Sequence, residues 1–380
     1  MHSIRQAFVH RLSAASPSDV SALTEVVNQG LIQADAIVAI LGKTEGNGCV
    51  NDFTRGLATL ALKAAVSGLS GLSLEQVSTR VAFVMSGGTE GGLSPHWLVF
   101  EVREIAESLA LKNMPATRSE APPALAIGVA MTAEFKPEEI GRSAQIMATA
   151  DAVRKAMLEA GITDPKDVHY VQVKCPLLTR QRIESAQARG ETLVTQDTYL
   201  SMGFSRGASA LGVALALGEI KPDQVSDASV CIDSSLYSGR ASTSSGIELM
   251  QNQIMVLGNS AAWQGDLQIA HAVMSDALDV DAVSDALASL GLQPGRDLRD
   301  RERNTICAVL AKAEAAKCGL IRGRRHTMLD DSDIHSSRHA RALVGGVLAG
   351  VFGETQLFVS GGAEHQGPDG GGPIAVIARF

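Results

Sequence analysis

The sequence lacks the features by which several classes of protein are recognised. Its five cysteines are scattered and include no Cys-x-x-Cys pair, which argues against a cysteine-rich zinc site or a dithiol redox site. The net charge of -8 and the pI of about 5.6 leave no basic excess that would attract phosphate backbones or anionic lipid. We therefore expect neither nucleic acid nor a membrane surface as a partner.

Long apolar runs are also missing. Met1 to Val20 has no apolar core followed by a small-residue cleavage site, and no run approaches the ~20 residues needed to cross a bilayer. These absences predict a cytoplasmic protein with reduced thiols. A chain of 380 residues with 45% hydrophobic content can form two or three domains with a buried core.

What the sequence does contain is one motif in three copies. The pattern Ser-x-Gly-x-Glu occurs at Ser86 to Glu90, Ser244 to Glu248 and Ser360 to Glu364. One match would carry little information because its residues are common. Three matches, each preceded by a lysine that closes a strand-like run, indicate an internal triplication.

The segments upstream of the motif repeat as well. Helical spacing of apolar residues recurs three times, each followed by a glycine suited to a helix C-terminus, at 19–28 before Gly30, 150–159 before Gly161 and 280–287 before Gly291. The glycines recur about every 130 residues, a domain-sized period. A strand that ends in lysine follows each glycine, at 37–43, 170–174 and 306–312. The third copy carries a polar insertion at 296–304.

Each copy continues with an arginine that we expect to open a small-residue helix: Arg55, Arg206 and Arg341. The spacing to a following Gly-Glu pair favours Arg341 over Arg338. A last strand is expected before each serine, at 81–85, 228–232 and 356–359.

Two breaks divide the copies. Leu111 to Pro123 is a proline-rich polar linker, and a second boundary near 251–253 precedes the strand-like 254–257, which mirrors 125–129. The predicted repeat units are 1–105, 112–250 and 254–380.

If the three units pack around a pseudo-threefold axis, their lysines, arginines and serines converge on one site; the alternative is that the units sit side by side. A serine hydroxyl is a weak nucleophile, which a neutral lysine amine can activate. Crowded positive charge and burial would favour the neutral amine. Glycines beside the serines could present amide groups to an oxyanion, and arginines could orient carbonyls. This combination suits hydrolysis of an amide or imide in a small molecule rich in carbonyls.

Specific runs carry a family resemblance. Gly42 to Asp52, Val171 to Leu178, Arg325 to Asp330 and Ser360 to Pro373 resemble the cyanuric acid hydrolase and barbiturase family of ring-opening amidohydrolases. The resemblance covers nearly the whole chain and is closer to the cyanuric acid hydrolase branch.

The resemblance implies an α/β fold in which three similar units with pseudo-threefold symmetry surround a central β-barrel, with helices outside. It implies that Lys174 is the catalytic base and Ser244 the nucleophile. The implied substrate-binding residues are Lys43, Arg55, Ser86, Gly87, Arg206, Ser245, Lys312, Arg341, Ser360 and Gly361.

The implied substrate is cyanuric acid, a cyclic imide whose ring is itself threefold symmetric, opened to carboxybiuret and then to biuret and carbon dioxide. The resemblance also implies a homotetramer and no organic cofactor. It implies a structural Mg or Ca ion, whose ligands would be Glu314, Ala363, Gln366, Gly367, Pro368 and Gly371, and oxygen ligands suit such hard cations.

Three alternatives remain open. A barbiturase would open barbituric acid to ureidomalonate, and the resemblance places the discrimination near Ser337 and Arg341. A non-catalytic protein would only bind a cyclic imide. A zinc amidohydrolase would need ligands such as His335 and His339, which we interpret instead as ordinary polar histidines.

Overall fold

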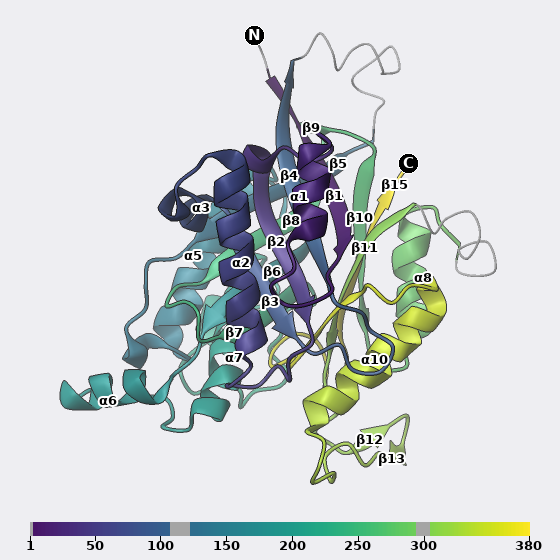
Figure 1. Cartoon of the computed structure of the whole chain (residues 1–380). Helices are drawn as coiled ribbons and strands as arrows, with labels where there is room; N and C mark the ends of the chain where they lie inside the picture. The colour runs from purple at the N-terminus through teal and green to yellow at the C-terminus, as the bar shows by residue number, and fades with distance from the viewer. Residues whose placement is uncertain (1–2, 107–121, 294–304) are drawn as a thin grey trace.

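The computed structural model describes residues 3–106, 122–293 and 305–380, and it is a mixed α/β fold. Strands run through the middle of the molecule and helices lie on the outside (Figure 1). Most strands belong to three larger sheets, and β12 (Leu320–Ile321) forms a short hairpin with β13 (Arg324–Arg325).

Apart from β9, the strands of each sheet are close in sequence. The first sheet contains β1 (Ser3–Ser13), β2 (Ile37–Thr44), β3 (Ala82–Gly87), β4 (His96–Ala106) and the two-residue β9 (Trp263–Gln264). The second contains β5 (Ala124–Met131), β6 (Val168–Pro176), β7 (Ala241–Gly246) and β8 (Gln253–Ser260). The third contains β10 (Leu267–Met274), β11 (Ile306–Ala313), β14 (Phe358–Gly361) and β15 (Gly372–Arg379).

The three sheets follow one plan. Their orders are β3-β2-β4-β1-β9, β7-β6-β8-β5 and β14-β11-β15-β10. In each sheet the first pair is parallel and the next two pairs are antiparallel. Even the irregularity repeats, because a register shift lies near the start of β2, β6 and β11. Among the described strands, hydrogen-bonded ladders do not close these sheets into one barrel.

Helices cover the outer faces of the sheets (Figure 1). The first sheet is packed by α1 (Ser21–Asn28), α2 (Phe53–Ser70) and α3 (Leu74–Arg80), and the second by α5 (Ser143–Glu159) and α7 (Thr198–Ala216), with α6 (Arg180–Ala188) beside them. The third is packed by α8 (Val280–Ser289) and α10 (Ser336–Phe352). Single 3-10 turns are η1 (Ala34–Ala36), η3 (Pro137–Glu139), η4 (Pro165–Asp167) and η5 (Pro222–Gln224).

Strand alternation decides which side chains reach the centre. Ala39 and Leu41 of β2 join a core cluster that all three sheets share, whereas Ile40 packs with Leu62 of α2 in a separate cluster. Successive side chains of a strand point to opposite faces, so Lys43 lies on the same central face as Ala39 and Leu41. The same alternation places the lysine at the end of β11 on the central side.

Most of the repeated elements were predicted correctly. The expected helices lie within α1, α5 and α8, apart from the first two residues of 19–28, and the strands ending in lysine lie within β2, β6 and β11. Residues 111–121 of the predicted linker 111–123 and the whole insertion at 296–304 lie outside the described residues.

Three sequence predictions are wrong. Residues 228–232 form turns in place of a strand, and the strand before the second serine is β7. Residues 254–257 belong to β8, which pairs with β5 and β6, so they do not start the third sheet or mirror β5. Arg55 lies in the first turn of α2 as expected, but the other two arginines do not open helices, since Arg206 lies in the middle of α7 and Arg341 in the second turn of α10.

No single helix in the described ranges is both long and apolar enough to cross a membrane; only α2 and α3 together meet these criteria, as a pair bent by 108°.

Candidate active site

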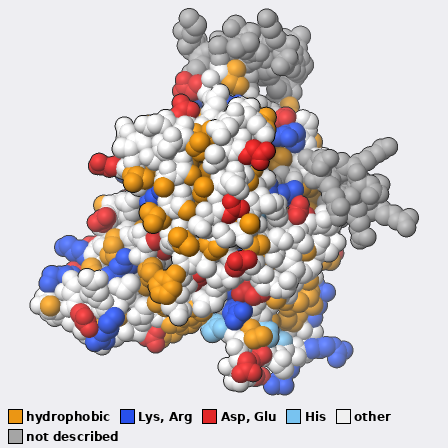
Figure 2. Space-filling view, in the orientation of Figure 1, with side chains coloured by type: hydrophobic (Ala, Val, Ile, Leu, Met, Phe, Trp, Pro, Cys, Tyr) orange, Lys and Arg blue, Asp and Glu red, His pale blue; other side chains and the backbone are white. Residues whose placement is uncertain are grey.

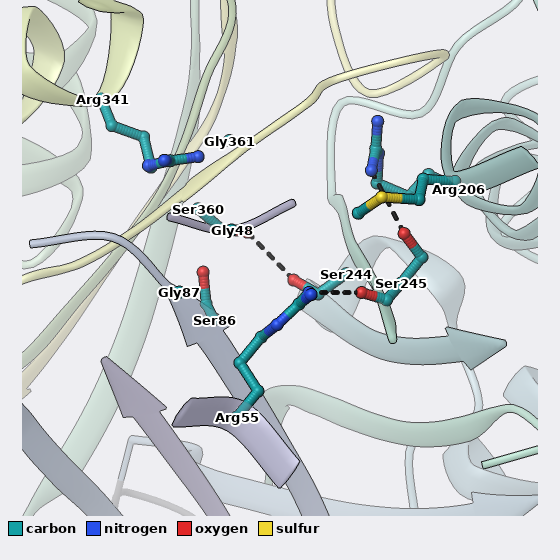
Figure 3. A pocket seen from close by; sticks show the side chains of 11 residues that line it. Gly48, Arg55, Ser86, Gly87, Arg206, Ser244, Ser245, Arg341, Ser360 and Gly361 are labelled. Carbon is teal, nitrogen blue, oxygen red and sulfur yellow. Dashed lines mark hydrogen bonds between the residues drawn. The ribbon is translucent and has the colours of Figure 1, made fainter. Parts of the chain in front are cut away.

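One pocket collects residues from all three sheets and their helices. It holds about 260 Å³ of empty space, part of it open to solvent. Its lining residues are Gly48, Arg55, Ser86, Gly87, Met202, Arg206, Ser244, Ser245, Arg341, Ser360 and Gly361. Figure 3 shows the three arginines around a central group of serines. Nine of these residues were named from the sequence, eight as binding groups and Ser244 as a catalytic group, and the fold brings them together.

The lysine and the serine of each predicted pair are neighbours on parallel strands. Lys43 is paired in register with Ser86, Lys174 with Ser244, and Lys312 with Ser360. The lysines are fully buried behind the serines that line the pocket. Three equivalent strand pairs therefore deliver three amines and three hydroxyls to one place.

The hydrogen bonds of the three pairs are not equivalent. Lys43 Nζ donates to Ser86 Oγ at 3.3 Å, and Lys312 Nζ donates to Ser360 Oγ at 3.2 Å. Ser244 Oγ instead lies 2.9 Å from Ser360 Oγ, and Lys174 Nζ forms an ion pair with Glu248 Oε1 at 2.7 Å. Catalytic hydrogen bonds often tighten only when substrate binds, so the missing Lys174 to Ser244 bond does not exclude that pair.

The lysines also join the sheets to one another. Lys43 Nζ donates to the carbonyl of Val359 at 2.8 Å, Lys174 Nζ to that of Met85 at 2.8 Å, and Lys312 Nζ to that of Thr243 at 2.9 Å. Each acceptor immediately precedes the serine of a different sheet. The three bonds form a cycle, which we call the lysine ring, that fixes the serine strands relative to each other.

Burial makes these lysines unusual. It lowers the pKa of Lys43 well below the ordinary value, and Arg341 adds to the effect. Burial and then Arg206 lower the pKa of Lys312 to about 7. Burial also lowers the pKa of Lys174, but the negative charge of Glu248 opposes it. A neutral amine is thus accessible near neutral pH at Lys312, and burial favours the neutral form of the other two lysines, the form that a base activating serine requires.

Two of the arginines are held by glutamates of the repeated motif. Arg206 binds Glu364 with Nε at 2.7 Å and Nη2 at 2.6 Å, and Arg341 binds Glu90 with Nε at 2.9 Å and Nη2 at 2.6 Å. Such two-pronged pairs fix the guanidinium plane. Arg55 differs, because its Nε faces Asp52 Oδ2 at 3.5 Å and its Nη1 donates to the carbonyl of Ser245 at 2.7 Å.

The predicted metal ligands lie around a second cavity. Glu314, Ala363, Gly367 and Pro368 line it, whereas Gln366 and Gly371 belong to the same loop without lining the cavity. Burial and the nearby charge of Glu364 raise the pKa of Glu314 to about 7. The carbonyls of Ala363 and Pro368 each accept one main-chain hydrogen bond and keep a second lone pair. One carboxylate with several carbonyl oxygens fits a hard cation.

Other histidine and cysteine clusters do not form a metal site. Within the described ranges there is no group of three or more His, Cys, Asp or Glu side chains arranged to hold an ion. His335 Nε2 lies 2.8 Å from the hydroxyl of Tyr199, while His339 Nε2 lies 2.9 Å from Asp331 Oδ2. The two histidines thus have different partners.

Ser337 does not line the pocket. It lies in the first turn of α10, where its Oγ is 3.0 Å from Nδ1 of His335, one turn before Arg341. An influence on the substrate would act through the position of that helix end.

Sequence reasoning missed Gly48 and Met202, which also line the pocket. It noted the glutamates of the motif without giving them a role, and it passed over Asp52. The threefold recurrence of the glutamate was the available signal. No repeat marks Asp52, since Gly203 and Arg338 stand at the equivalent distance before the other two arginines.

Comparison with known proteins gives one family. Residues 8–379 match the family model described as "Amidohydrolase ring-opening protein". The chain is 56% identical over 371 residues to a cyanuric acid amidohydrolase of Ectopseudomonas oleovorans (98% of this chain, 99% of the relative) and 57% identical over 377 residues to one of Bradyrhizobium sp. strain ORS 375 (99% and 98%). A solved cyanuric acid hydrolase superposes with a TM-score of 0.92 at 50% identity, covering 99% of this chain and 100% of the other.

Proposed function

Because this chain belongs to the ring-opening amidohydrolase family, we propose that it is a cyanuric acid amidohydrolase that cleaves a C-N bond of the cyclic amide. The relatives named cyanuric acid amidohydrolase match over nearly their whole length, which supports the same substrate. The products would be carboxybiuret and, after loss of carbon dioxide, biuret.

The observation that carries this proposal is the composition of the pocket. Cyanuric acid presents three carbonyls and three N-H groups in alternation around one ring. Besides Ser245, the pocket presents one serine from the end of a strand in each of the three sheets and one arginine from a helix packed on each sheet. A guanidinium has a fixed fork of donors that suits a carbonyl, and serine hydroxyls both donate and accept. A ring with this symmetry could form hydrogen bonds with the serine and the arginine of all three units at once.

In the proposed reaction Ser244 attacks one ring carbonyl and Lys174 takes its proton. The same lysine then returns a proton to the departing ring nitrogen as the C-N bond breaks. Water releases the acyl group from Ser244, with the proton again passing through Lys174. The remaining serines and lysines, the three arginines, Ser245, and the backbone of Gly87 and Gly361 would hold the other carbonyls.

We also propose that the chain consists of three repeat units around a pseudo-threefold axis, with the sheets forming a barrel-like centre. The shared strand order and the shared central core support this arrangement. The pairing of β8 with β5 and β6 favours a boundary after Ser260 in place of one near 251–253.

A structural Mg or Ca ion is proposed at the second cavity. Glu314 and the carbonyls of Ala363, Gln366, Gly367, Pro368 and Gly371 would hold it. The ion would neutralise the buried carboxylates there and fix the loop that follows Ser360; the reaction itself needs no organic cofactor.

The homotetramer and the cytoplasmic location stay predictions. An apolar stripe on α2 supports self-association, because Phe53, Leu57 and Leu60 are 72%, 49% and 64% exposed. Hydrophobic side chains are visible on the face that carries α2 (Figure 2). Sedimentation of the purified protein would test the tetramer, and a monomer at working concentration would exclude it.

The proposed activity is tested by supplying cyanuric acid and barbituric acid separately and following loss of each ring. We expect biuret and carbon dioxide from cyanuric acid and little turnover of barbituric acid. The reverse result would identify a barbiturase, and tight binding without turnover would identify a binding protein. Ser244→Ala and Lys174→Ala should each abolish turnover while leaving the circular dichroism spectrum unchanged.

A further inference from the structure

The three glutamates that end the repeated motif do not bind the same kind of partner. Glu90 is bound by Arg341 and Glu364 by Arg206, in each case an arginine from another sheet's helix. Glu248 should bind Arg55 if the pattern continued. It instead lies 2.7 Å from the amine of Lys174, and this contact is an ion pair without the alignment of a hydrogen bond.

The position of Asp52 explains why Glu248 pairs with Lys174 and not with Arg55. Asp52 precedes Arg55 by one helical turn, and its Oδ2 lies 3.5 Å from Arg55 Nε. Gly203 and Arg338 stand at the equivalent positions before the other arginines and cannot supply a negative charge. A side chain on Gly203 would also approach Glu364 Oε1 to 3.0 Å. Arg55 is therefore the one arginine of the three that faces a carboxylate immediately before its own helix.

We propose that Glu248 is a positioning residue that makes the middle pair a triad, with Ser244 as nucleophile, Lys174 as base and Glu248 as the group that orients the base. This inference rests on the proposed function and deepens it, because it gives a reason why one of three similar pairs does the chemistry.

Two contacts define where the amine of Lys174 points. Its neutral form has two N-H groups and one lone pair; one N-H donates to the carbonyl of Met85 at 2.8 Å, and the contact with Glu248 at 2.7 Å draws the second N-H toward that carboxylate. The lone pair is then left for another neighbour, and Ser244 is paired with Lys174 in register. Lys43 and Lys312 instead use N-H groups on their own serines, which suits them to binding.

The carboxylate also stabilises what the reaction creates. When Lys174 takes the proton of Ser244, an ammonium forms in a fully buried place, where an isolated charge is costly. Glu248 supplies the opposite charge in contact with it. A third group that orients the base and stabilises its protonated form is the general logic of nucleophile, base and orienter.

The surroundings keep Glu248 ionised. Lys174 on β6, Arg55 and Lys63 on α2, and Arg182 on α6 are the charged groups that interact with it. Burial acts to raise the pKa of Glu248, but Lys174 and Arg55 outweigh it and lower that pKa. Glu248 in turn raises the pKa of Lys174 against the effect of burial. Replacing Glu248 by glutamine should therefore lower the pKa of Lys174.

The test is the pH profile of kcat/KM for wild type, Glu248→Gln and the matched controls Glu90→Gln and Glu364→Gln. If Lys174 must be neutral to act, activity rises with pH through its pKa. We call this rise of kcat/KM with pH the limb of the profile. In Glu248→Gln we expect the limb to move to lower pH by about one unit or more, because the negative charge in contact with Lys174 has been removed. We also expect kcat to fall at least about 10-fold, within the range that a positioned base contributes. The controls should change KM and leave the limb in place.

A second variant distinguishes loss of the proposed role from loss of activity through misfolding. Glu248→Asp keeps the charge but shortens the side chain, so it should lower kcat without moving the limb. Ionisation of the substrate would place the same limb at the same pH in every profile and so cannot imitate a shift that is confined to Glu248→Gln. An unmoved limb in Glu248→Gln, or an equal shift in Glu90→Gln, would overturn the triad. If instead Lys174→Ala keeps full activity, the proposed assignment of the base fails, and that outcome is distinct from failure of the triad.

Discussion

The carboxylate of Asp52 occupies the space that a side chain at Gly87 would need. A Cβ placed on Gly87 would lie 1.8 Å from Asp52 Oδ2, and one on Gly361 would lie 2.6 Å from Nη1 of Arg341. The equivalent residue in the second sheet is Ser245, whose hydroxyl accepts a hydrogen bond from Arg206 at 3.2 Å. Glycine is thus required at two of the three positions because charged side chains fill the space.

Gly87→Ser is the first predicted loss of function. The new side chain must displace Asp52, which caps α2 and faces Arg55, so an arginine of the pocket moves as well. We expect kcat/KM to fall by about 100-fold or more, since displacements near 1 Å have such effects. Ser245→Gly is the matched control and should cost only about 10-fold, the value of one charged hydrogen bond. Steady-state kinetics would measure both, and equal losses would contradict this account.

The serines should separate into one nucleophile and two binding groups. Ser86→Ala removes a hydroxyl that lines the pocket and contacts Lys43. We expect mainly a rise in KM, of about 10-fold, because a lost binding hydrogen bond weakens substrate and transition state together. Ser244→Ala should instead remove turnover. A Ser86→Ala protein as inactive as Ser244→Ala would refute the division of labour.

Arg341→Lys should show that charge alone does not suffice. The lysine keeps the positive charge but loses the planar fork that binds both oxygens of Glu90. We expect KM to rise by about 10-fold or more with a smaller change in kcat, measured with cyanuric acid. Arg180→Lys, at an exposed surface pair, is the control and should behave as wild type. An unchanged KM in Arg341→Lys would show that the fork does not bind substrate.

Lys312 should give stability a specific dependence on pH. Its pKa is lowered to about 7 by burial from 10.5, so between these values the unfolded chain binds more protons at this site than the folded chain. Stability therefore rises with pH across this window, by at most about 1.4 kcal/mol per pH unit. Lys312→Met should remove that contribution, so that its urea unfolding free energy rises less steeply from pH 7 to pH 9. The exposed Lys166→Met is the control, and a slope that Lys312→Met leaves unchanged would contradict the prediction.

Removal of the proposed ion should affect stability more than chemistry. A strong chelator is expected to lower the Tm of the wild type, because the carboxylates of Glu314 and Glu364 would be left close together without a cation. The Tm of Glu314→Gln should respond much less. Differential scanning calorimetry with and without added Mg or Ca would measure this. A wild-type Tm indifferent to chelator would argue against a structural ion.

The repeated elements of the fold could be predicted because equivalent elements are buried in each of the three copies and therefore carry the same apolar pattern. The strands that end in lysine are apolar runs whose length and flanking glycines indicate their type. The strand β7 could not be found by that signal. Its sequence, Ala-Ser-Thr-Ser-Ser-Gly, has no apolar alternation; it is a strand because it pairs in parallel register with β6, and all six of its residues are buried. Residues 228–232 look apolar but form turns, since Ser229 Oγ bonds the carbonyl of Ser226.

The repeated serines and arginines of the pocket were visible from repetition, but its asymmetry was not. Serines, lysines and arginines recur at matching places, so their convergence follows once the units pack together. Which arginine each glutamate binds depends on helices from different sheets, and no local pattern encodes this. The exchange of partners at Glu248 results from a single unrepeated residue, Asp52.

The lysine ring has a consequence for the order in which the protein becomes active during synthesis. Lys43 and its acceptor Val359 are separated by 316 positions in the chain. A ribosome-bound chain that already contains Ser244, the proposed nucleophile, still lacks β14, which supplies that acceptor and Ser360. Until that strand is made and docked, the buried amine of Lys43 has one acceptor fewer and the pocket is open on one side. Catalysis should therefore begin only after the third sheet has emerged, so a partly made chain should not hydrolyse substrate.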